Sequence, residues 1–239
     1  MSLTTARGPL GPDPAGRFSS PLPPDLVYVE PHPRRIQAVV DGSVVIDTEH
    51  AVIVHRPGRT LTYAFPPEVV AGLPSTPEPA ASGFVTVPWD AVDTWIEEGR
   101  PLVHYPPNPY HRVDCRPTTR RLRVEVAGRA LVDTDDTTIV FETGHAPRLY
   151  VDAARARTDL LRRTATTSYC NYKGWATWWA AVVDGVVIED VAWSYDDPPP
   201  ESLPITGYLS FDEQKADVVS GVPRAAALAR DATAPGARS

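Results

Sequence analysis

Residues 34–58 read RRIQAVVDGSVVIDTEHAVIVHRPG, and residues 120–144 read RRLRVEVAGRALVDTDDTTIVFETG. Laid over each other at an offset of 86, nine of their 25 positions are identical, and five of the other pairs exchange one apolar residue for another. A second echo follows, in which GFVTV at residues 83–87 matches GYLSF at residues 207–211. Agreement at a fixed offset indicates an internal repeat.

The two copies of this repeat differ in length. From Gly58 to Gly83 is 25 residues, whereas Gly144 to Gly207 is 63. The first copy therefore lacks a segment that the second copy carries at residues 165–202.

Four regions follow from the repeat. We expect a shortened, degenerate first unit over residues 27–114 and a complete second unit over residues 115–223. The flanking residues 1–26 and 224–239 are rich in Pro, Gly, Ala and Ser. They should be poorly ordered or lie along the surface, because they carry few large apolar groups.

Both units have the periodicity of half-buried strands, since apolar residues alternate with others. The alternating positions are Ile36, Ala38 and Val40 in the first unit, and Leu122, Val124 and Val126 in the second. Asp41-Gly42 and Ala127-Gly128 follow these runs and are typical of tight hairpin turns. Residues 51–55 and 137–141 add a third strand to each unit, and Asp152 to Leu161 is predicted to form one short helix capped by Asp152.

A further hairpin is predicted inside the extra segment. Trp175 to Val182 leads into Asp184-Gly185, a strong hairpin turn signal, and the return strand runs from Val187 to Tyr195. A two-residue turn would place Trp178 opposite Val191. With 27 prolines in the chain, long helices are disfavoured, so the fold class is mostly β with few short helices.

The segment before this hairpin resembles a known family. Cys170-Asn171-Tyr172-Lys173-Gly174 is similar to the Cys-Pro-Tyr-Lys-Gly signature of the domain of unknown function 427 family. Ala192 to Tyr195 and Gly207-Tyr208 resemble its next landmarks, and residues 104–114, HYPPNPYHRVD, resemble the junction of two-copy members from actinobacteria. The sequence departs from the signature at Asn171, where the family has proline, and the first unit lacks the signature.

The resemblance implies two tandem β-tent-like units, similar in shape to methionine sulfoxide reductase B and to the ligand-binding domain of cereblon. It implies no established activity. Because the signature occurs once, any site should be single and should lie in the second unit.

Two residues of the signature are candidate catalytic groups. Cys170 and Lys173 lie three positions apart, and an ammonium group can activate a nearby thiolate. Lysine is scarce, with Lys173 and Lys215 as the two examples in the chain. The alternative is a buried cysteine that packs as a small apolar group while Lys173 pairs with Asp190 or with Asp196, which a two-residue turn would place opposite it.

Aromatic and polar residues around the hairpin are candidate ligand-binding groups, because aromatic faces stack on flat or cationic ligands. The candidates are Tyr172, Lys173, Trp178, Trp193, Tyr195, Glu142 and Tyr150. Core packing is the alternative for the tryptophans, and a solvated strand face is the favoured alternative for Glu142.

Cofactors and metals are not expected. His104, His111 and Cys115 lie within twelve residues, but their spacing matches no common zinc pattern. The chain has two cysteines and lacks both a phosphate-binding loop and a Gly-x-Ser-x-Gly elbow. A surface or packing role is favoured for these histidines.

Charge and hydropathy limit the partners. A net charge of −7 argues against nucleic acid, and no apolar run has the length of a membrane helix. Without a signal peptide we expect a cytoplasmic protein, and the oligomeric state stays open.

The sequence thus favours small-molecule binding in a pocket of the second unit. An enzyme that uses Cys170 or Lys173 in the same pocket is one alternative. A structural or partner-binding protein without a pocket is the other.

Overall fold

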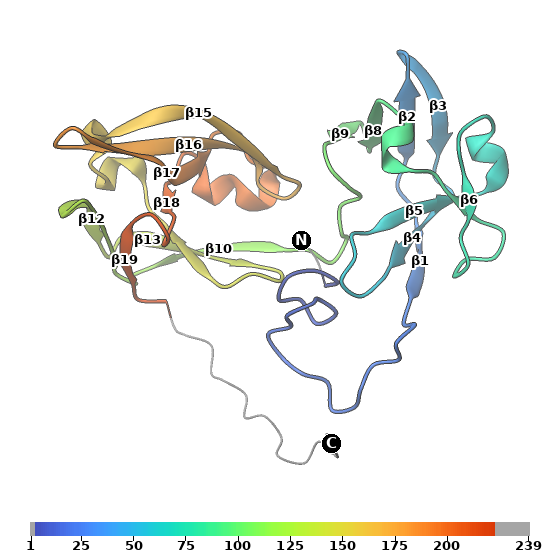
Figure 1. Ribbon diagram of the computed structural model, residues 1–239, viewed down its shortest axis with the longest axis horizontal. Helices are drawn as coiled ribbons and strands as arrows, with labels where there is room; N and C mark the ends of the chain where they lie inside the picture. Colours follow the sequence, from blue (N-terminus) through green and yellow to red (C-terminus); the bar gives the residue numbers. More distant parts are fainter. Residues whose placement is uncertain (1–2, 223–239) are drawn as a thin grey trace.

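The computed structural model describes residues 3–222, which form two lobes lying side by side (Figure 1). Within these residues, nineteen strands form five antiparallel sheets, and the helical elements are short 3-10 turns. The protein is therefore mostly β, as the alternation of apolar residues predicts. No helix in this part of the chain has both the length and the apolar character needed to cross a membrane.

Two sheets and two 3-10 turns form the first lobe. One sheet has the order β1-β4-β5-β7-β6, with β1 Tyr28–His32, β4 Ala51–His55, β5 Thr62–Phe65, β7 Val85–Thr86 and β6 Thr76–Pro77. The other has the order β3-β2-β8-β9, with β3 Ser43–Thr48, β2 Ile36–Val40, β8 Thr94–Glu97 and β9 Arg100–Leu102. The turns are η1 Pro67–Val70 and η2 Trp89–Ala91. The core between the sheets includes Ile36, Ile53, Phe65 and Trp95.

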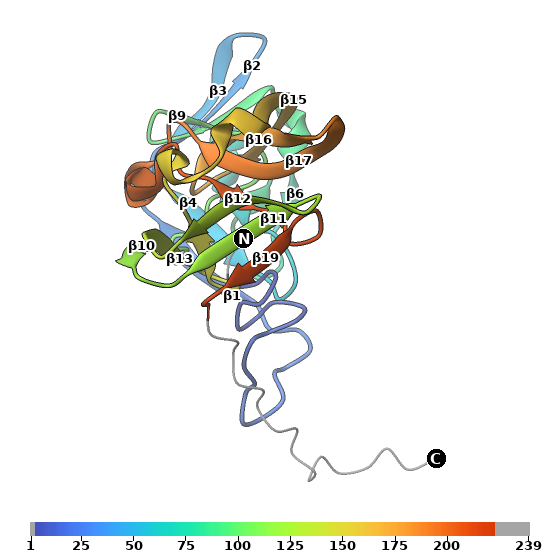
Figure 2. The same cartoon turned by 90° about the vertical axis from the view of Figure 1, so that its left-hand side faces the viewer.

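Three sheets form the second lobe, which Figure 2 shows facing the viewer. The first is β10-β13-β14, with β10 Val113–Thr118, β13 Thr137–Glu142 and β14 Arg148–Tyr150. The second is β12-β11-β19, with β12 Arg129–Thr134, β11 Leu122–Val126 and β19 Asp217–Ser220. The third is β15-β16-β17-β18, with β15 Leu161–Cys170, β16 Gly174–Val183, β17 Val186–Tyr195 and β18 Ser210–Phe211. The 3-10 turns are η3 Ala153–Arg155, η4 Thr158–Leu160 and η5 Pro200–Ile205.

Strands at equivalent positions of the repeat are paired in the same way in both lobes. Tyr28 of β1 lies opposite His55 of β4, and at an offset of 86 Asp114 of β10 lies opposite Phe141 of β13. The β4–β5 and β13–β14 pairs have the same register at this offset. In both lobes the first hairpin has its bulge at the equivalent position, between Ala38 and Val39 and between Val124 and Glu125.

Side-chain contacts repeat at the same offset. Arg35 binds Asp47 across β2 and β3, and Arg121 binds Asp133 across β11 and β12 with Nε–Oδ1 distances of 2.7 Å in both. These agreements are what a repeat requires. The two-unit organisation stays a prediction, and superposition of residues 27–114 on 115–223 tests it.

The amino-terminal segment runs along both lobes. The amide of Gly58 donates to the carbonyl oxygens of Thr4 and Leu10 at 2.7 and 3.0 Å. The amide of Arg7 donates to the carbonyl oxygen of Gly144, the position equivalent to Gly58, at 3.1 Å. This part of residues 1–26 therefore lies on the surface of the sheets, whereas the predicted tail 224–239 falls outside the described residues.

The predicted helix from Asp152 to Leu161 is wrong as a single element. Asp152 does cap a helical turn, because its side chain accepts from the Ala154 amide at 2.8 Å. The turn ends at Ala156, which is extended and bridges to Val132 of β12. Pairing with the sheet interrupts the helix, so two separate 3-10 turns form.

The long hairpin of β16 and β17 has a different register from the predicted one. Trp178 lies opposite Trp193 and not opposite Val191. Three residues of β17, centred on Asp190, oppose the single residue Ala180, which shifts the register by two. Asp190 adopts a positive φ of 55° at this bulge. A shift of two keeps every side chain on its face, so Trp178 and Trp193 share one face.

The first hairpin turns of the two lobes provide a matched stability test. Asp41 and Ala127 occupy the same turn position with φ of 49° and 48°. Asn and Asp tolerate this left-handed conformation, whereas alanine is strained by about 1–2 kcal/mol. Ala127→Asn should therefore raise the free energy of unfolding by about 1 kcal/mol in chemical denaturation. Asp41→Ala should lower it, and an Ala127→Asn variant no more stable than the parent would contradict this account.

Candidate functional site

Glu142 lies at the end of β13, and its carboxylate joins three segments of the chain. It forms an ion pair with Lys173 and accepts from His111 Nε2 at 3.2 Å. The thiol of Cys170 points to the same carboxylate, with an Sγ–Oε1 distance of 4.0 Å. The Glu142 side chain is 11% exposed. The expectation that Glu142 lies on a solvated strand face is therefore wrong, because the 170–174 turn and the junction before β10 cover it.

The turn that carries Lys173 is fixed by its backbone. The Lys173 amide donates to the Cys170 carbonyl at 3.3 Å, and Gly174 has a φ of 85°. A Cβ on Gly174 would lie 3.2 Å from the carbonyl oxygen of Asp197, so glycine is needed for both the conformation and the close approach. The turn directs the Lys173 side chain toward β13.

The predicted partners of Lys173 are wrong. Asp196 instead accepts from Arg163 at 3.1 Å and from Thr177 at 3.2 Å. Asp190 accepts from two threonine hydroxyls, of which Thr164 lies at 2.7 Å. The bulge in β17 moves Asp196 away from the register position opposite Lys173, so the lysine reaches a carboxylate of another sheet.

The charges at this cluster are set by burial and by mutual contact. Burial by itself raises the pKa of Glu142, but the His111 hydrogen bond and the charges of Lys173 and His145 lower it to about 2. Burial would lower the pKa of Lys173, yet the neighbouring Cys170 and Glu142 raise it above its ordinary value. Near pH 7 the pair is therefore an ammonium and a carboxylate.

His111 connects the cluster to the junction between the lobes. Its ring stacks on Tyr172 with centroids 3.5 Å apart and an interplanar angle of 9°. Burial lowers the pKa of His111, so the ring is neutral near pH 7 and donates its Nε2 hydrogen to Glu142. Tyr172, a predicted ligand-binding residue, accepts from the Asn108 amide at 2.8 Å. It therefore faces the junction and not the aromatic cavity described next.

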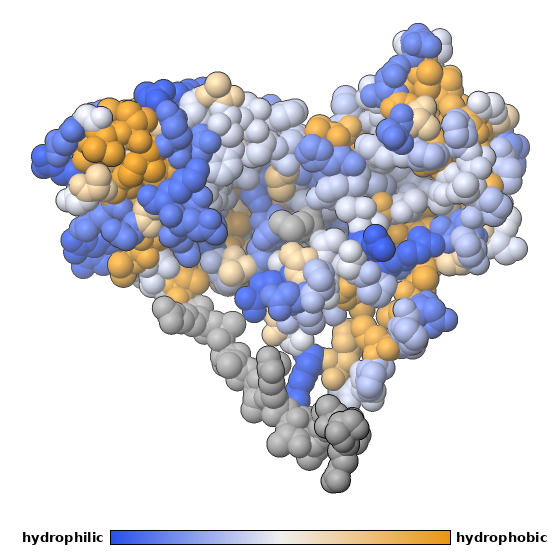
Figure 3. Space-filling model, viewed as in Figure 1, coloured by the Kyte–Doolittle hydropathy of each residue, from blue (hydrophilic) through white to orange (hydrophobic). Residues whose placement is uncertain are grey.

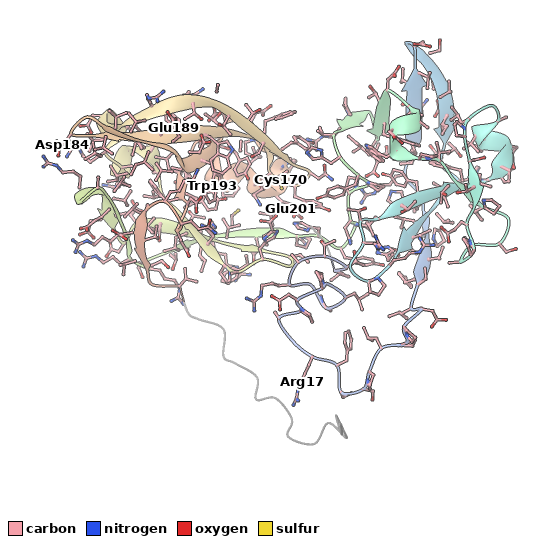
Figure 4. All side chains as sticks on the ribbon, in the orientation of Figure 1. Arg17, Cys170, Asp184, Glu189, Trp193 and Glu201 are labelled. Atoms are coloured by element: carbon pink, nitrogen blue, oxygen red, sulfur yellow. The ribbon has the colours of Figure 1, made fainter. Side chains whose placement is uncertain are left out.

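A cavity of about 430 Å³ opens beside the ion pair. Its walls include six of the predicted ligand-binding residues: Glu142, Tyr150, Lys173, Trp178, Trp193 and Tyr195. Trp178 and Trp193 form one wall, with ring centroids 5.4 Å apart and tilted by 46°. Figure 4 shows Trp193 within the second lobe and Cys170 at the end of that lobe nearest the first. Cys170 is not among the residues that line the cavity.

The tyrosine hydroxyls of the cavity are fixed or buried. Trp193 donates its indole N–H to the Tyr150 hydroxyl at 3.2 Å. Burial is the main cause that raises the pKa of both Tyr150 and Tyr195, so both phenols stay protonated near pH 7. Both hydroxyls therefore keep a proton that can be donated to a neighbouring acceptor.

Arg148 and His145 also line the cavity, although the sequence analysis did not select them as site residues. Arg148 lies over the Trp193 ring, 5.0 Å from its centroid, and donates to the Phe211 carbonyl at 2.9 Å. His145 lies 3.9 Å from Glu142, and burial lowers its pKa. Both follow β13 closely in sequence. Their closeness in sequence to Glu142 and Tyr150, which were selected, could have identified them as site residues.

The geometry thus defines a mostly β protein whose second lobe holds an aromatic-walled cavity over a buried ion pair. The sequence of this lobe is similar to that of a known protein family. The family model described as domain of unknown function DUF427 matches residues 114–221. This match supports the DUF427 family for the second half of the chain, as the Cys170–Gly174 resemblance implies. No curated protein matches the sequence.

No zinc is predicted to support this fold. Within residues 3–222, no group of three or more His, Cys, Asp and Glu side chains is arranged to hold a metal ion. Cys115 packs beside the core, and burial raises the pKa of its thiol to about 11. Elemental analysis of the purified protein should find substoichiometric zinc, and a chelator should leave the melting temperature unchanged. A stoichiometric metal would overturn this prediction.

Acid should weaken the fold through Glu142. A carboxyl group whose folded pKa is about 2 and whose ordinary value is 4.5 stabilises the folded state above pH 4.5. That contribution should be lost progressively as the pH falls from 4.5 toward 2. In denaturation measured from pH 6 down to pH 2, Glu142→Gln should be less stable than the parent at pH 6 but should lose less stability on acidification. Parallel pH profiles for the two proteins would contradict the assignment.

Proposed function

We propose that the cavity of the second lobe binds a small, flat organic molecule that carries an acidic group. The observation that supports this proposal is the combination of aromatic and charged side chains that line the cavity. Aromatic faces from Trp178 and Trp193 stand beside a guanidinium, a paired ammonium and buried phenols. Aromatic walls with convergent polar and charged groups are a common composition of small-molecule sites.

The charge of the lining favours an acid over a base. Glu142 is neutralised by Lys173, whereas Arg148 has a weak contact of 4.0 Å with the exposed Glu213. Arg148 also lies against the Trp193 ring, the position that a cationic ligand would otherwise take. The cavity therefore has a net positive charge, and a carboxylate or phosphate complements it.

Binding without covalent chemistry is favoured over catalysis by Cys170 or Lys173. A nucleophilic lysine must lose its proton, and the pKa of Lys173 is raised. The Cys170 thiol directs its hydrogen to Glu142 and lies outside the cavity lining. The enzyme stays the alternative function, and a protein without a ligand is the other.

We also infer that the chain is a two-copy form in which the first copy is shortened. The equal registers at an offset of 86 support this inference. Position 56, the counterpart of Glu142, is Arg56, which pairs with Glu78 inside its own lobe. The first copy therefore lacks both the carboxylate and the lysine-bearing turn, and the proposed site is single. A net charge of −7 argues against a nucleic-acid partner.

Aromatic carboxylates, aryl phosphates and size-matched aromatic amines should be compared by thermal shift. A ligand that binds the folded state raises the melting temperature. The acids should raise it, the amines should not, and Arg148→Met should weaken binding of the acids at least about tenfold, as expected when a charged hydrogen bond is lost. If no acid raises the melting temperature, or if amines act equally, the proposed ligand class is wrong.

The two lysines supply a matched control. Lys173→Met keeps the side-chain stem and removes the charge beside the cavity, so it should weaken binding. Lys215→Met removes an exposed ammonium that donates to the Glu189 carbonyl, and it should leave binding unchanged. Glu142→Gln combined with Lys173→Met removes both charges and checks that lost binding does not arise from an unpaired buried carboxylate. Equal effects of the two lysine variants would contradict the site.

A further inference from the structure

The two lobes face each other across a second hollow, separate from the aromatic cavity. Figure 3 shows the notch between the lobes, and β9 and η5 lie on its opposite sides in Figure 1. Its volume is about 480 Å³. Both lobes and the junction line it, including Arg34, Arg100, Asn108, His111, Asn171 and Tyr172. We call this hollow the inter-lobe cleft.

Buried polar atoms without partners are concentrated at the cleft. Within residues 3–222, three such side-chain atoms occur: Asn108 Nδ2, His111 Nδ1 and Asn171 Oδ1. All three belong to residues that line the cleft. Leaving a buried donor or acceptor unpaired costs about 1–3 kcal/mol, so their grouping in one wall needs an explanation.

Each of these side chains is held in place by its other polar atom. Asn108 Oδ1 accepts from the Tyr110 amide at 2.7 Å, and Asn171 Nδ2 donates to the Tyr105 carbonyl at 3.1 Å. His111 is held through Nε2 by Glu142. The wall therefore offers one N–H donor and two acceptors, because the neutral His111 ring keeps a lone pair on Nδ1.

The opposite wall carries positive charge in a fixed position. Arg34 donates to Glu97 at 2.5 Å, and Glu97 is itself 6% exposed. His32 at 3.0 Å and the Tyr63 hydroxyl also bind this carboxylate. A guanidinium has five donors, so Arg34 keeps several that Glu97 does not use.

Arg100 adds a second guanidinium to this wall. It is exposed on β9 and forms no ion pair within residues 3–222. Glu98 and the Arg112–Glu201 pair balance the total charge of the lining, so the cleft favours a ligand with a localised negative group over a polyanion.

We propose that the inter-lobe cleft binds a small carboxylic acid that carries an amide, the class of N-acylated amino acids and peptide carboxyl termini. The carboxylate would bind Arg34 and Arg100, since guanidinium matches carboxylate in geometry. The amide oxygen would accept from Asn108 Nδ2, and the amide N–H would donate to Asn171 Oδ1. The three unpaired atoms are closed off from bulk water. The terminal torsion of asparagine is soft, and a small rotation brings Asn108 Nδ2 and Asn171 Oδ1 to the cleft.

N-acetylglycine is the smallest probe of this class, and acetate and acetamide are its two halves. Titration of the full chain should be followed by the side-chain amide signals of Asn108 and Asn171 in ¹H–¹⁵N spectra. N-acetylglycine should shift both signals and should bind at least about tenfold tighter than either half. Arg100→Gln should weaken binding by about tenfold, whereas Arg59→Gln, an exposed arginine of the same lobe outside the cleft, should not.

A second variant separates binding from folding. Asn171→Ser shortens the amide side chain and should weaken N-acetylglycine while leaving acetate unchanged. The melting temperature of each variant is measured alongside. Binding that is equal in Arg100→Gln and the parent would overturn the proposal. So would a buried water that stays at the Asn108 amide at saturating probe, seen as a water cross-peak, or the absence of any shift at millimolar probe.

Discussion

The buried carboxylate of Glu142 is the constraint on which the second lobe depends. It holds the end of β13, the 170–174 turn and the junction before β10 through Lys173, Cys170 and His111. Removing one partner of such a pair leaves an uncompensated charge and costs about 3–5 kcal/mol. The same residues lie between the aromatic cavity and the inter-lobe cleft. The contacts of the Glu142 carboxylate therefore position the walls of both hollows.

The His111 ring is the shared wall of that arrangement. One nitrogen binds Glu142 beside the aromatic cavity, and the other belongs to the group of unpaired atoms at the inter-lobe cleft. Stacking on Tyr172 prevents the ring from turning without moving the junction. A change in the protonation of His111 would therefore alter the hydrogen bonding and the charge both at the aromatic cavity and at the inter-lobe cleft.

Local patterns in the sequence predicted the strands around residues 36–40, 51–55, 122–126 and 137–141 and the β16–β17 hairpin, because period-two alternation and turn residues such as Asp184-Gly185 act over a few positions. The register of the long hairpin was not predictable in this way, since the bulge at Asp190 depends on contacts from β15. The partner of Lys173 lies 31 positions away on another sheet. Glu142 has the polar character of a surface residue, and nothing near it in sequence indicates the turn that covers it.

The scarcity of lysine has a practical consequence for chemical labelling. Of the two side-chain amines, Lys173 is 6% exposed and bound to Glu142, whereas Lys215 is exposed on the second lobe. An amine-reactive dye is consumed by a free, deprotonated amine, and Lys173 offers neither access nor a lone pair. Such a reagent is therefore directed to Lys215 among the lysines, a position for a fluorophore or a surface linkage away from both hollows.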